Sequence, residues 1–263
     1  MTPAYSTGDQ LASVNVNGQT QAFGYDVNWN RTNKTYFNGN SEQVASVYKT
    51  NKLDYLRLNG GLIKYLAYDA RGSVTNNQRG AFAYDQRGNL SQSTVGTTVG
   101  TYAYNVFNQR VKKTVGANST IFLYDEASNL AGEYNASGAM LSEHIYLGAL
   151  PIGVKQGGTI YGVHADYLGT PRVITSGAAV VWKWEMADPF GMNAPSVQTI
   201  AYNPRFPGQY FDAENGLHSN RYRVYDPYLG RYMQSDPIDL AGGMNSYNYA
   251  NANANEWSGS DGT

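Results

Sequence analysis

A short unit built on the dipeptide Tyr-Asp recurs along this chain, and it limits the possible folds more than any other feature of the sequence. Tyr-Asp pairs stand at residues 25–26, 68–69, 84–85, 124–125 and 225–226, with Tyr-Asn variants at 104–105 and 134–135. The frames "YDQRGNLSQ", "YNVFNQRVKK" and "YDEASNLAGE" begin at Tyr84, Tyr104 and Tyr124, which are 20 residues apart. A fixed period of this length is typical of stacked repeat units.

Each unit has the pattern of a β-hairpin. A short alternating run such as "AFAYD" predicts a strand, and the Asp side chain then accepts backbone hydrogen bonds that start a turn. Gly or Asn follows in "RGN", "RGS" and "ASN", at the position that requires a positive φ. The next run, for example "NLSQST", predicts the returning strand. Because a single hairpin is only marginally stable, neighbouring hairpins are expected to extend a shared sheet.

The composition also favours an all-β class. The 263 residues include 23 Tyr and 29 Gly but only 8 Phe and 4 Trp, and a chain rich in Tyr, Gly, Asn, Thr and Val favours strands and turns. No long helix is expected, apart from a single turn near "ASGAMLSEH" (residues 136–144). The formal net charge is −1 and there is no basic run, which argues against nucleic-acid binding. No stretch of about eighteen apolar residues predicts a membrane span.

The residue types that carry most chemistry are absent or scattered. Cysteine is absent, which excludes disulfides, thiolate catalysis and zinc–thiolate sites. The histidines, His144, His164 and His218, lack the close spacing of a zinc site. The Asp residues of the Tyr-Asp pairs occur singly, whereas metal-binding loops gather several carboxylates within about a dozen residues. We therefore interpret these Asp residues as turn residues and expect neither a metal nor a cofactor.

The later part of the sequence resembles a known family. The segments "HADYLGTPRVIT" and "VVWKWEMADPFG" precede the long block "NPRFPGQYFDAENGLHSNRYRVYDPYLGRYMQSDPIDLAGGMNSYNY". In order and spacing, the stretch from His164 to Tyr249 is similar to the repeat-associated core domain of Rhs (rearrangement hotspot) proteins. The Tyr-Asp units resemble the YD repeats of the same family, which is related to the C component of Tc insecticidal toxins and to the YD shell of teneurins.

This resemblance implies a fold and a domain organisation. In such proteins the YD repeats form a long β-sheet that spirals into a hollow shell, and in the bacterial members the shell encloses a toxic C-terminal domain. The expected fold is therefore a set of stacked YD-repeat hairpins that form a curved sheet or partial β-barrel, capped by a turn-rich core domain. The expected division is a YD-repeat region over residues 1–163 and a core domain, or C-terminal plug, over residues 164–263.

The block that resembles the core alternates basic and aromatic residues. Arg205, Arg221, Arg223 and Arg231 are interleaved with Tyr residues, and a stacked guanidinium–aromatic pair contributes about 0.5–1 kcal/mol when exposed and more when desolvated. The same pattern could serve as a platform for single-stranded nucleic acid. Because the block also carries several carboxylates, a packing role is favoured and no nucleic-acid partner is expected.

The resemblance also implies a possible proteolytic site. In bacterial Rhs and Tc proteins the end of the core acts as an aspartic autoprotease, in which two carboxylates share a proton and act as base and acid. The first corresponds to Asp236 in "SDPIDL", where Asp239 replaces the usual Gly of a DPxG turn. The second falls within "NANEWSGSDGT", where Asp261 is the nearest carboxylate, shifted from the family position. Asp236 and Asp261 are thus the candidate catalytic residues, a capped Asp-Pro turn is an equal alternative for Asp236, and weak or no self-cleavage is expected.

Three functions follow as hypotheses. The first is a non-enzymatic shell fragment of an Rhs polymorphic toxin, which encapsulates or presents a C-terminal toxin domain. The second is an aspartic autoprotease that releases such a domain. The third is a cell-surface carbohydrate-binding or adhesion module, because exposed Tyr and Trp faces can stack on sugars.

The expected partner is the C-terminal toxin domain or another protein cargo. Secretion-system components are further candidates, as is a second copy of the chain joined through open sheet edges. The start, "MTPAYSTGDQ", lacks the basic and apolar blocks of a signal peptide. We therefore expect a bacterial effector that is cytoplasmic before export by a signal-free route, or a fragment of a longer chain.

Overall fold

The computed structural model describes residues 2–47, 50–61, 63–185, 187–237 and 245–250. These residues form three antiparallel β-sheets and no α-helix, so none of them belongs to a helix that is long and apolar enough to cross a membrane. The predicted all-β class is confirmed. The helical turn expected within residues 136–144 is wrong, because a tight turn there leads directly into a strand, Met140–Leu147.

The first sheet has seven strands that pair in sequence order. They are β1 (Thr2–Tyr5), β2 (Leu11–Val16), β3 (Gln19–Tyr25), β4 (Arg31–Thr35), β5 (Ser41–Ser46), β6 (Leu53–Leu58) and β7 (Ile63–Tyr65).

The second sheet has fourteen strands, which also pair in sequence order. They are β8 (Ala67–Tyr68), β9 (Val74–Asn76), β10 (Ala81–Tyr84), β11 (Leu90–Val95), β12 (Thr98–Tyr104), β13 (Arg110–Val115), β14 (Asn118–Tyr124), β15 (Leu130–Asn135), β16 (Met140–Leu147), β17 (Leu150–Gln156), β18 (Thr159–Ala165), β19 (Pro171–Ser176), β20 (Ala179–Lys183) and β21 (Val197–Gln198).

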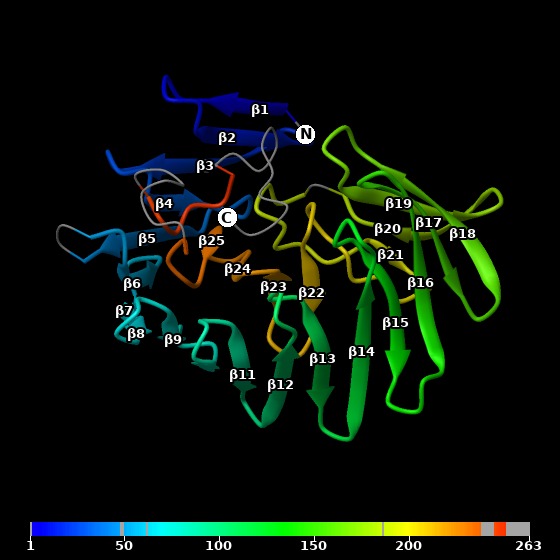
Figure 1. Ribbon diagram of the computed structural model, residues 1–263. Helices are drawn as coiled ribbons and strands as arrows, with labels where there is room; N and C mark the ends of the chain where they lie inside the picture. Colours follow the sequence, from blue (N-terminus) through cyan, green and yellow to red (C-terminus); the bar gives the residue numbers. More distant parts are fainter. Residues whose placement is uncertain (1, 48–49, 62, 186, 238–244, 251–263) are drawn as a thin grey trace.

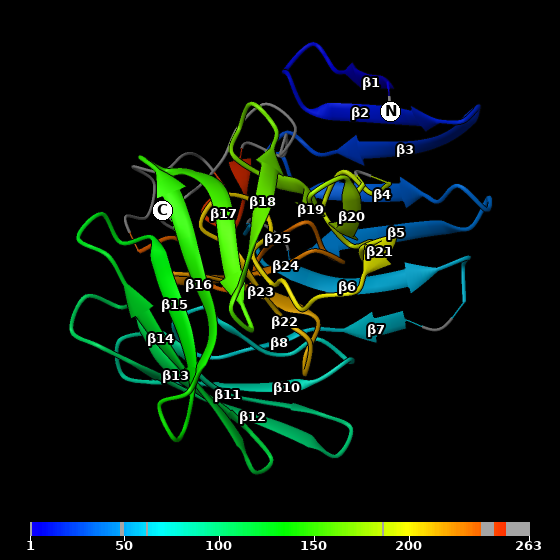
Figure 2. The same cartoon turned by 90° about the vertical axis from the view of Figure 1, so that its right-hand side faces the viewer.

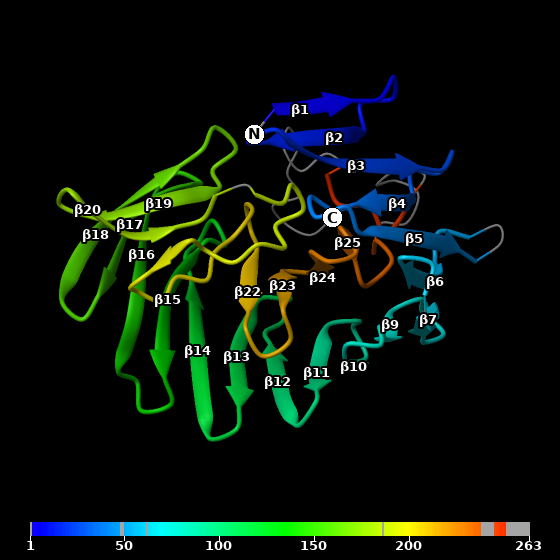
Figure 3. The same ribbon diagram turned by 180° about the vertical axis from the view of Figure 1, so that it is seen from behind.

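The first two sheets follow one arc, which we call the wall (β1–β21). In Figure 1 the arc runs from the blue strands through cyan and green to yellow-green, and the third sheet lies inside it. This third sheet has four strands, β22 (Tyr210–Asp212), β23 (Leu217–Asn220), β24 (Arg223–Asp226) and β25 (Arg231–Tyr232). The side and rear views show the same arrangement (Figures 2 and 3). Residues 202–237 and 245–250, which include this sheet, are called the inner layer.

The wall is curved and open, and it consists of two sheets. Among the described strands, β1 and β21 are its two ends and do not pair with each other, and β7 does not pair with β8. The predicted stacking of hairpins into a curved sheet is confirmed. The predicted boundary between residues 163 and 164 falls inside β18, and the wall continues beyond it to β21. The division into two domains stays a prediction.

The turns that follow the Tyr-Asp pairs have the predicted chemistry. Asp85 Oδ1 accepts backbone hydrogen bonds from Arg87 (2.8 Å) and Asn89 (2.9 Å), and Gly88 between them has a φ of 86°. In "ASN", however, the residue with a positive φ is Ser128 (φ 68°). Asn129 instead donates its side-chain amide to Asp125 Oδ2 (2.9 Å).

The Tyr-Asp turns lie at one rim of the wall. Consecutive turns of an antiparallel meander alternate between two rims, and the turns after Tyr84, Tyr104 and Tyr124 each follow the second strand of a hairpin pair. Tyr134 and Asn135 end β15, one strand later, so their turn lies at the opposite rim. Asn135 Oδ1 accepts backbone hydrogen bonds from Ser137 (3.0 Å) and Ala139 (2.9 Å), so this pair marks the predicted kind of turn, at the other rim.

Three of the repeat tyrosines bond to the preceding repeat. The strand pairing shifts by one residue between Ala103 and Tyr104, which leaves a bulge where Tyr104 faces Arg110. The hydroxyl of Tyr124, one repeat later, donates to the backbone carbonyl of Arg110 at 3.1 Å. Equivalent bonds join Tyr25 to the Leu11 carbonyl (3.1 Å) and Tyr84 to the Val74 carbonyl (2.8 Å). These tyrosines thus tie successive hairpins together at their bulges, and burial raises the pKa of Tyr124 to about 12.

The apolar core lies between the wall and the inner layer. One cluster joins wall residues such as Phe82 and Leu90 to Leu217 and Met233 of the inner layer. A second joins residues of β17–β20, including Trp182, to aromatic residues of the inner layer, including Tyr225. Because each cluster draws on both parts, neither the wall nor the inner layer encloses a complete core alone.

We expect the Tyr124→Phe substitution to lower the free energy of unfolding by about 1–2 kcal/mol, because it leaves the buried Arg110 carbonyl without its hydrogen bond. Urea unfolding followed by tryptophan fluorescence measures the change. Tyr65→Phe is the matched control, since the Tyr65 side chain is exposed. Equal stability of the two variants would contradict a stabilising hydrogen bond between the Tyr124 hydroxyl and the Arg110 carbonyl at the bulge.

Candidate functional site

The concave face of the wall is the candidate functional site, because it holds the inner layer through buried charges. Arg110 begins β13 and its guanidinium pairs with Asp212 at the end of β22. Lys113 Nζ, from the same strand, lies 3.0 Å from Asp212 Oδ1 and 3.2 Å from Glu214 Oε2. The bulge at Arg110 shifts the alternation of β13 by one residue, so Arg110 and Lys113 share the concave face, where both Arg110 and Asp212 are almost fully buried.

A second set of polar contacts holds the turn after β24. Asp226 is fully buried, and its Oδ2 accepts hydrogen bonds from Arg79 and from Asn77 Nδ2 (3.2 Å), both on the wall. Its other oxygen accepts the backbone N–H of Tyr228 (3.0 Å), which is the same turn chemistry as in the repeats. The Arg79 guanidinium also stacks on the Tyr228 ring, 4.6 Å from the centroid.

The first sheet carries buried charges too. Arg31 pairs with Glu42 at 3.1 Å, and Lys34 pairs with Asp188 at 2.7 Å. Asp188 belongs to the turn "DPFG", so this pair links the first sheet to the chain that leaves β20. Burial lowers the pKa of Lys34 below its ordinary value, against the attraction of Asp188.

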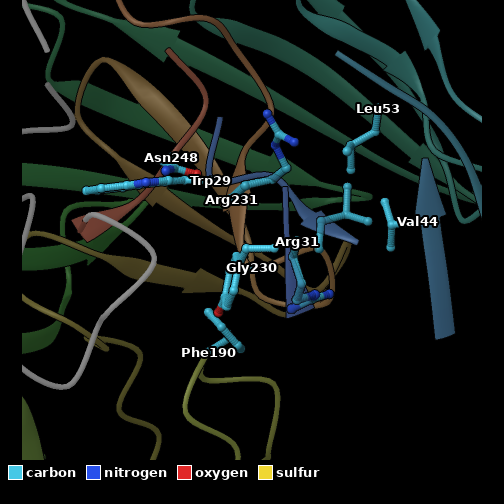
Figure 4. A pocket seen from close by; sticks show the side chains of 10 residues that line it. Trp29, Arg31, Val44, Leu53, Phe190, Gly230, Arg231 and Asn248 are labelled. Carbon is cyan, nitrogen blue, oxygen red and sulfur yellow. The ribbon is translucent and has the colours of Figure 1, made fainter. Parts of the chain in front are cut away.

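Side chains of the first sheet, such as Arg31 and Leu53, and of the inner layer, such as Arg231, line one small pocket (Figure 4). A cavity of about 10 Å³ remains beside Arg31, Arg231 and Phe190, which is about the room for one water molecule. Gly230 has a φ of 69°, and a Cβ atom there would lie 2.9 Å from Arg31 Nη1 and from Phe190. Glycine at this position therefore permits the close approach.

Glu133 is the centre of a buried polar network. Its Oε1 accepts from Ser142 (3.0 Å) and contacts His144 Nε2 (3.1 Å), and its Oε2 accepts from the Tyr210 hydroxyl (2.6 Å). Burial opposes ionisation, but the hydrogen bonds from these groups hold the pKa of Glu133 below its ordinary value. Ser142 and Glu133 both meet the same nitrogen of His144. The network therefore lacks the two-nitrogen relay of a nucleophilic triad and ties β15 and β16 to the inner layer.

Asp236 lies at a cavity of about 310 Å³ that is also lined by Arg71, Arg87 and Gln234. Its Oδ2 is 2.8 Å from the Arg223 guanidinium, and both side chains are buried. Its backbone N–H donates to the Ser246 carbonyl at 2.7 Å. The contacts of Asp236 are those of a tied Asp-Pro turn, and the lining of this cavity contains no second carboxylate among the described residues.

The second candidate catalytic residue, Asp261, lies outside the described residues, as does Asp239 of the same Asp-Pro turn as Asp236. The pairing of Asp236 with Asp261 thus falls outside the described part of the chain, and the autoprotease stays a prediction. Within the part of the chain that the structure covers, no group of three or more His, Asp or Glu side chains is arranged to hold a metal ion.

The arginine residues of the inner layer stack on aromatic rings as the sequence predicted. Arg223 lies 3.7 Å from the centroid of the Tyr232 ring, and Arg231 lies 4.9 Å from that of Tyr247. Arg205 departs from the expectation, since it stacks on Phe211 (4.8 Å), on Trp184 just after β20 (5.2 Å) and on Trp182 of the wall (5.6 Å) rather than on a tyrosine. This ladder thus joins the inner layer to the wall.

Comparison with known proteins identifies the family. The description "Teneurin YD-shell" matches residues 1–254. The chain belongs to the teneurin YD-shell family. This match confirms the resemblance to YD-repeat and Rhs-type shells that the sequence motifs indicated.

Several curated relatives of this YD-shell protein are named as bacterial toxins. It is 29% identical over 227 residues to "Double-stranded DNA deaminase toxin A" of Burkholderia cenocepacia, and this match covers 70% of this chain and 16% of the relative. It is 44% identical over 88 residues to "Toxin protein Tse5" of Pseudomonas aeruginosa, and this match covers 33% of this chain and 7% of the relative. The chain thus spans less than a fifth of the length of these toxins.

The fold also matches a solved shell. The crystal structure of TcdB2-TccC3-TEV superposes with a TM-score of 0.64 at 14% identity, covering 99% of this chain and 17% of that chain. At this identity the likeness shows the fold alone. The arc of paired hairpins in Figure 1 is therefore a segment of a YD-type repeat shell.

Sequence reasoning missed the residues that join the wall to the inner layer. Arg110 and Asp212 are 102 positions apart, and Glu133 and Tyr210 are 77 apart. The sequence offered one signal. Arg110, Lys113 and Glu133 are charged residues within strands whose other positions include apolar residues, which is unusual. Such charges indicate a partner, because a charged side chain is almost never fully buried unless paired.

We expect the Asp212→Asn substitution to lower the free energy of unfolding by about 3 kcal/mol, because it leaves the buried cations Arg110 and Lys113 without their partner. The control is Glu143→Gln, which breaks a half-exposed pair with Lys155 and should cost less than about 1 kcal/mol. Urea unfolding of both variants measures the two costs. Similar losses of unfolding free energy in the two variants would contradict a larger contribution of the buried contacts of Asp212 to stability.

Stability should also fall on acidification through His218. Burial lowers the pKa of this imidazole well below its ordinary value, and its Nδ1 lies 2.6 Å from Gln209 Oε1. Below about pH 6.5 the unfolded chain binds a proton that the folded chain does not, so the free energy of unfolding falls by up to about 1.4 kcal/mol per pH unit.

The measurement is urea unfolding between pH 7.5 and 5 for the parent chain and for His218→Gln. The variant should show a smaller loss between these pH values. His164→Gln, at an exposed position, should keep the slope of the parent. A slope that is unchanged in His218→Gln would refute the assignment.

Proposed function

We propose that this chain forms part of the wall of a polymorphic-toxin shell that encloses or presents a C-terminal toxin domain. The observation that carries the proposal is the YD-shell family match over residues 1–254, together with an arc of strands whose concave face holds a folded polypeptide layer. Relatives that are named as toxins support a toxin domain as the cargo. The shell acts as a barrier and carries out no chemistry of its own.

The open edges of the wall fit this role. Among the described strands, β1 and β21 end the wall with unpaired backbone groups, and such edges pair readily with further strands. We propose that other shell strands, or a second copy of the chain, occupy them. The solved relative is a complex named TcdB2-TccC3, which supports a role as one segment of a larger assembly that acts after export from a bacterial cell.

Self-cleavage is the second candidate, and one observation bears on it. Asp236 lies at an open cavity, but its carboxylate is engaged by Arg223. We therefore propose that Asp236 fixes the Asp-Pro turn and that self-cleavage is weak or absent. A carbohydrate-binding or adhesion role would be shown by binding to a glycan array.

A fusion of a folded, protease-sensitive reporter after Thr263 tests both proposals. We expect proteinase K to cut this reporter more slowly than the same reporter fused before Met1, because only the first position follows the shell wall in the family arrangement. Equal cutting rates at the two ends would contradict enclosure. On a gel the fusion should remain intact during purification, and efficient cleavage that is abolished by Asp236→Asn would instead establish the autoprotease.

A further inference from the structure

Lys34 and Asp188 form a buried contact between the first sheet and the chain that follows β20. The Lys34 side chain is fully buried, and its Nζ lies 2.7 Å from Asp188 Oδ2. A lysine is almost never fully buried unless it is paired, and a buried ion pair adds little net stability because both ions lose their water. Stability alone therefore does not account for this pair.

A second carboxyl group stands beside the pair. Glu42 of β5 is directly opposite Lys34 of β4 in the strand register, and both side chains are fully buried. Directly opposite residues lie on the same face of a sheet, with Cβ atoms about 4.5–5.5 Å apart. An amine, the carboxyl group that it contacts and a second carboxyl group are thus gathered in one buried place, which we call the lysine site (Lys34, Glu42 and Asp188).

The surroundings of the lysine site are aromatic. Lys34 Nζ lies 4.7 Å from the centroid of the Tyr36 ring, and Phe190 packs edge-to-face on Phe23 with the ring centroids 5.1 Å apart. The Phe190 N–H donates to Asp188 Oδ1 at 2.9 Å, which orients this carboxyl group. Burial of this kind disfavours charged forms, and it lowers the pKa of Lys34 below its ordinary value. Transfer of one proton within the Lys34–Asp188 contact removes both charges.

The corresponding lysine of the second sheet has different contacts. Lys113 follows Arg110 by three positions, as Lys34 follows Arg31, and its Nζ lies 3.0 Å from Asp212. The Lys113 side chain is 12% exposed, and Arg110 pairs with the same carboxylate. In the first sheet, by contrast, Arg31 pairs with Glu42. The Lys34 contact is thus the more deeply buried of the two, and its carboxylate is not the one that the arginine engages.

We propose that Lys34 and Asp188 join in an intramolecular isopeptide bond. The Lys34 ammonium gives one proton to the Asp188 carboxylate, and the neutral amine nitrogen attacks Asp188 Cγ. The new C–N bond forms, the C–OH bond breaks, and Glu42 carries a second proton from the nitrogen to the departing hydroxyl. One ammonium and one carboxylate become one amide and one water molecule, without a change of oxidation state and without a co-reactant.

The bond closes the chain between positions that are 154 residues apart. It ties β4 of the first sheet covalently to the turn after β20 of the second sheet, and a cross-link that closes a long loop restricts the unfolded chain. The bond forms once in each chain and converts no other molecule. The proposal therefore does not rest on the barrier role, and either can fail without the other.

Mass spectrometry of the denatured full chain tests the proposal. The parent chain should weigh less than its sequence by the mass of one water molecule. Trypsin should release residues 32–49 joined to residues 184–205, because it does not cut after a lysine whose amine has become an amide. The full sequence mass would overturn the proposal, as would a lost water located at another residue, for example in a cyclic imide at Asp261.

Two carboxyl variants separate the roles within the lysine site. Asp188→Ala removes the group that is attacked, and Glu42→Gln keeps the size of the side chain but cannot accept the proton, so both variants should keep the full sequence mass. Glu143→Gln is the matched control, because its half-exposed pair with Lys155 lies outside the site, and it should lose one water as the parent does.

Circular dichroism checks that the variants are folded, and the parent measurement decides the bond itself even where a variant does not fold. Loss of water from Asp188→Ala would overturn the bond between Lys34 and Asp188. An undiminished yield of the cross-linked peptide in Glu42→Gln would overturn the proton transfer by Glu42.

Discussion

The bond from a repeat tyrosine to the bulge carbonyl of the preceding hairpin is the contact on which the wall depends. A bulge leaves a backbone group outside the regular ladder and bends the strand. In this protein bulges recur at the rim of the Tyr-Asp turns, beside Tyr25, Tyr84, Tyr104 and Tyr124, and one also lies beside Tyr134 at the opposite rim. Bends that repeat at the same rim add in the same sense, which is how bulges curve a sheet. The hydroxyl satisfies the carbonyl that the bend leaves free, so curvature is obtained without an unpaired buried group.

A curved wall has a concave face that must be covered. Apolar residues such as Phe82 and Trp182 would be exposed on it without the inner layer. The buried charges make the dependence mutual. Arg110 and Asp212 each lose water on packing, and each would be an uncompensated buried charge without the other. Wall and inner layer are therefore best understood as one folding unit, although no described strand of the inner sheet pairs with a strand of the wall.

Local chemistry could be predicted from the sequence, and long-range pairing could not. The Asp turn depends on residues within five positions, so "YDQRGN" was enough to place the turn and its Gly88. The bulge could not be predicted, because a shift of one residue leaves no mark in composition. The choice of Ser128 over Asn129 for the positive φ depends on Asp125, which already binds the Asn129 amide. The rim at which the turn after Tyr134 lies could not be predicted either, since it depends on the number of strands between the turns.

The candidate site shows the same limit in another form. The family motif identified Asp236 and its turn, but the partner of its carboxylate, Arg223, could be found only from the pairing around β24. That partner changes the chemistry, because a carboxylate held by a guanidinium serves a structural role that a proton-sharing dyad does not. The charges of the concave face are likewise used by Asp212, Asp226 and Glu214 of this chain. A cargo behind such a wall would therefore meet surfaces whose charges are already paired, and it would be retained by enclosure rather than by a specific interface with this segment.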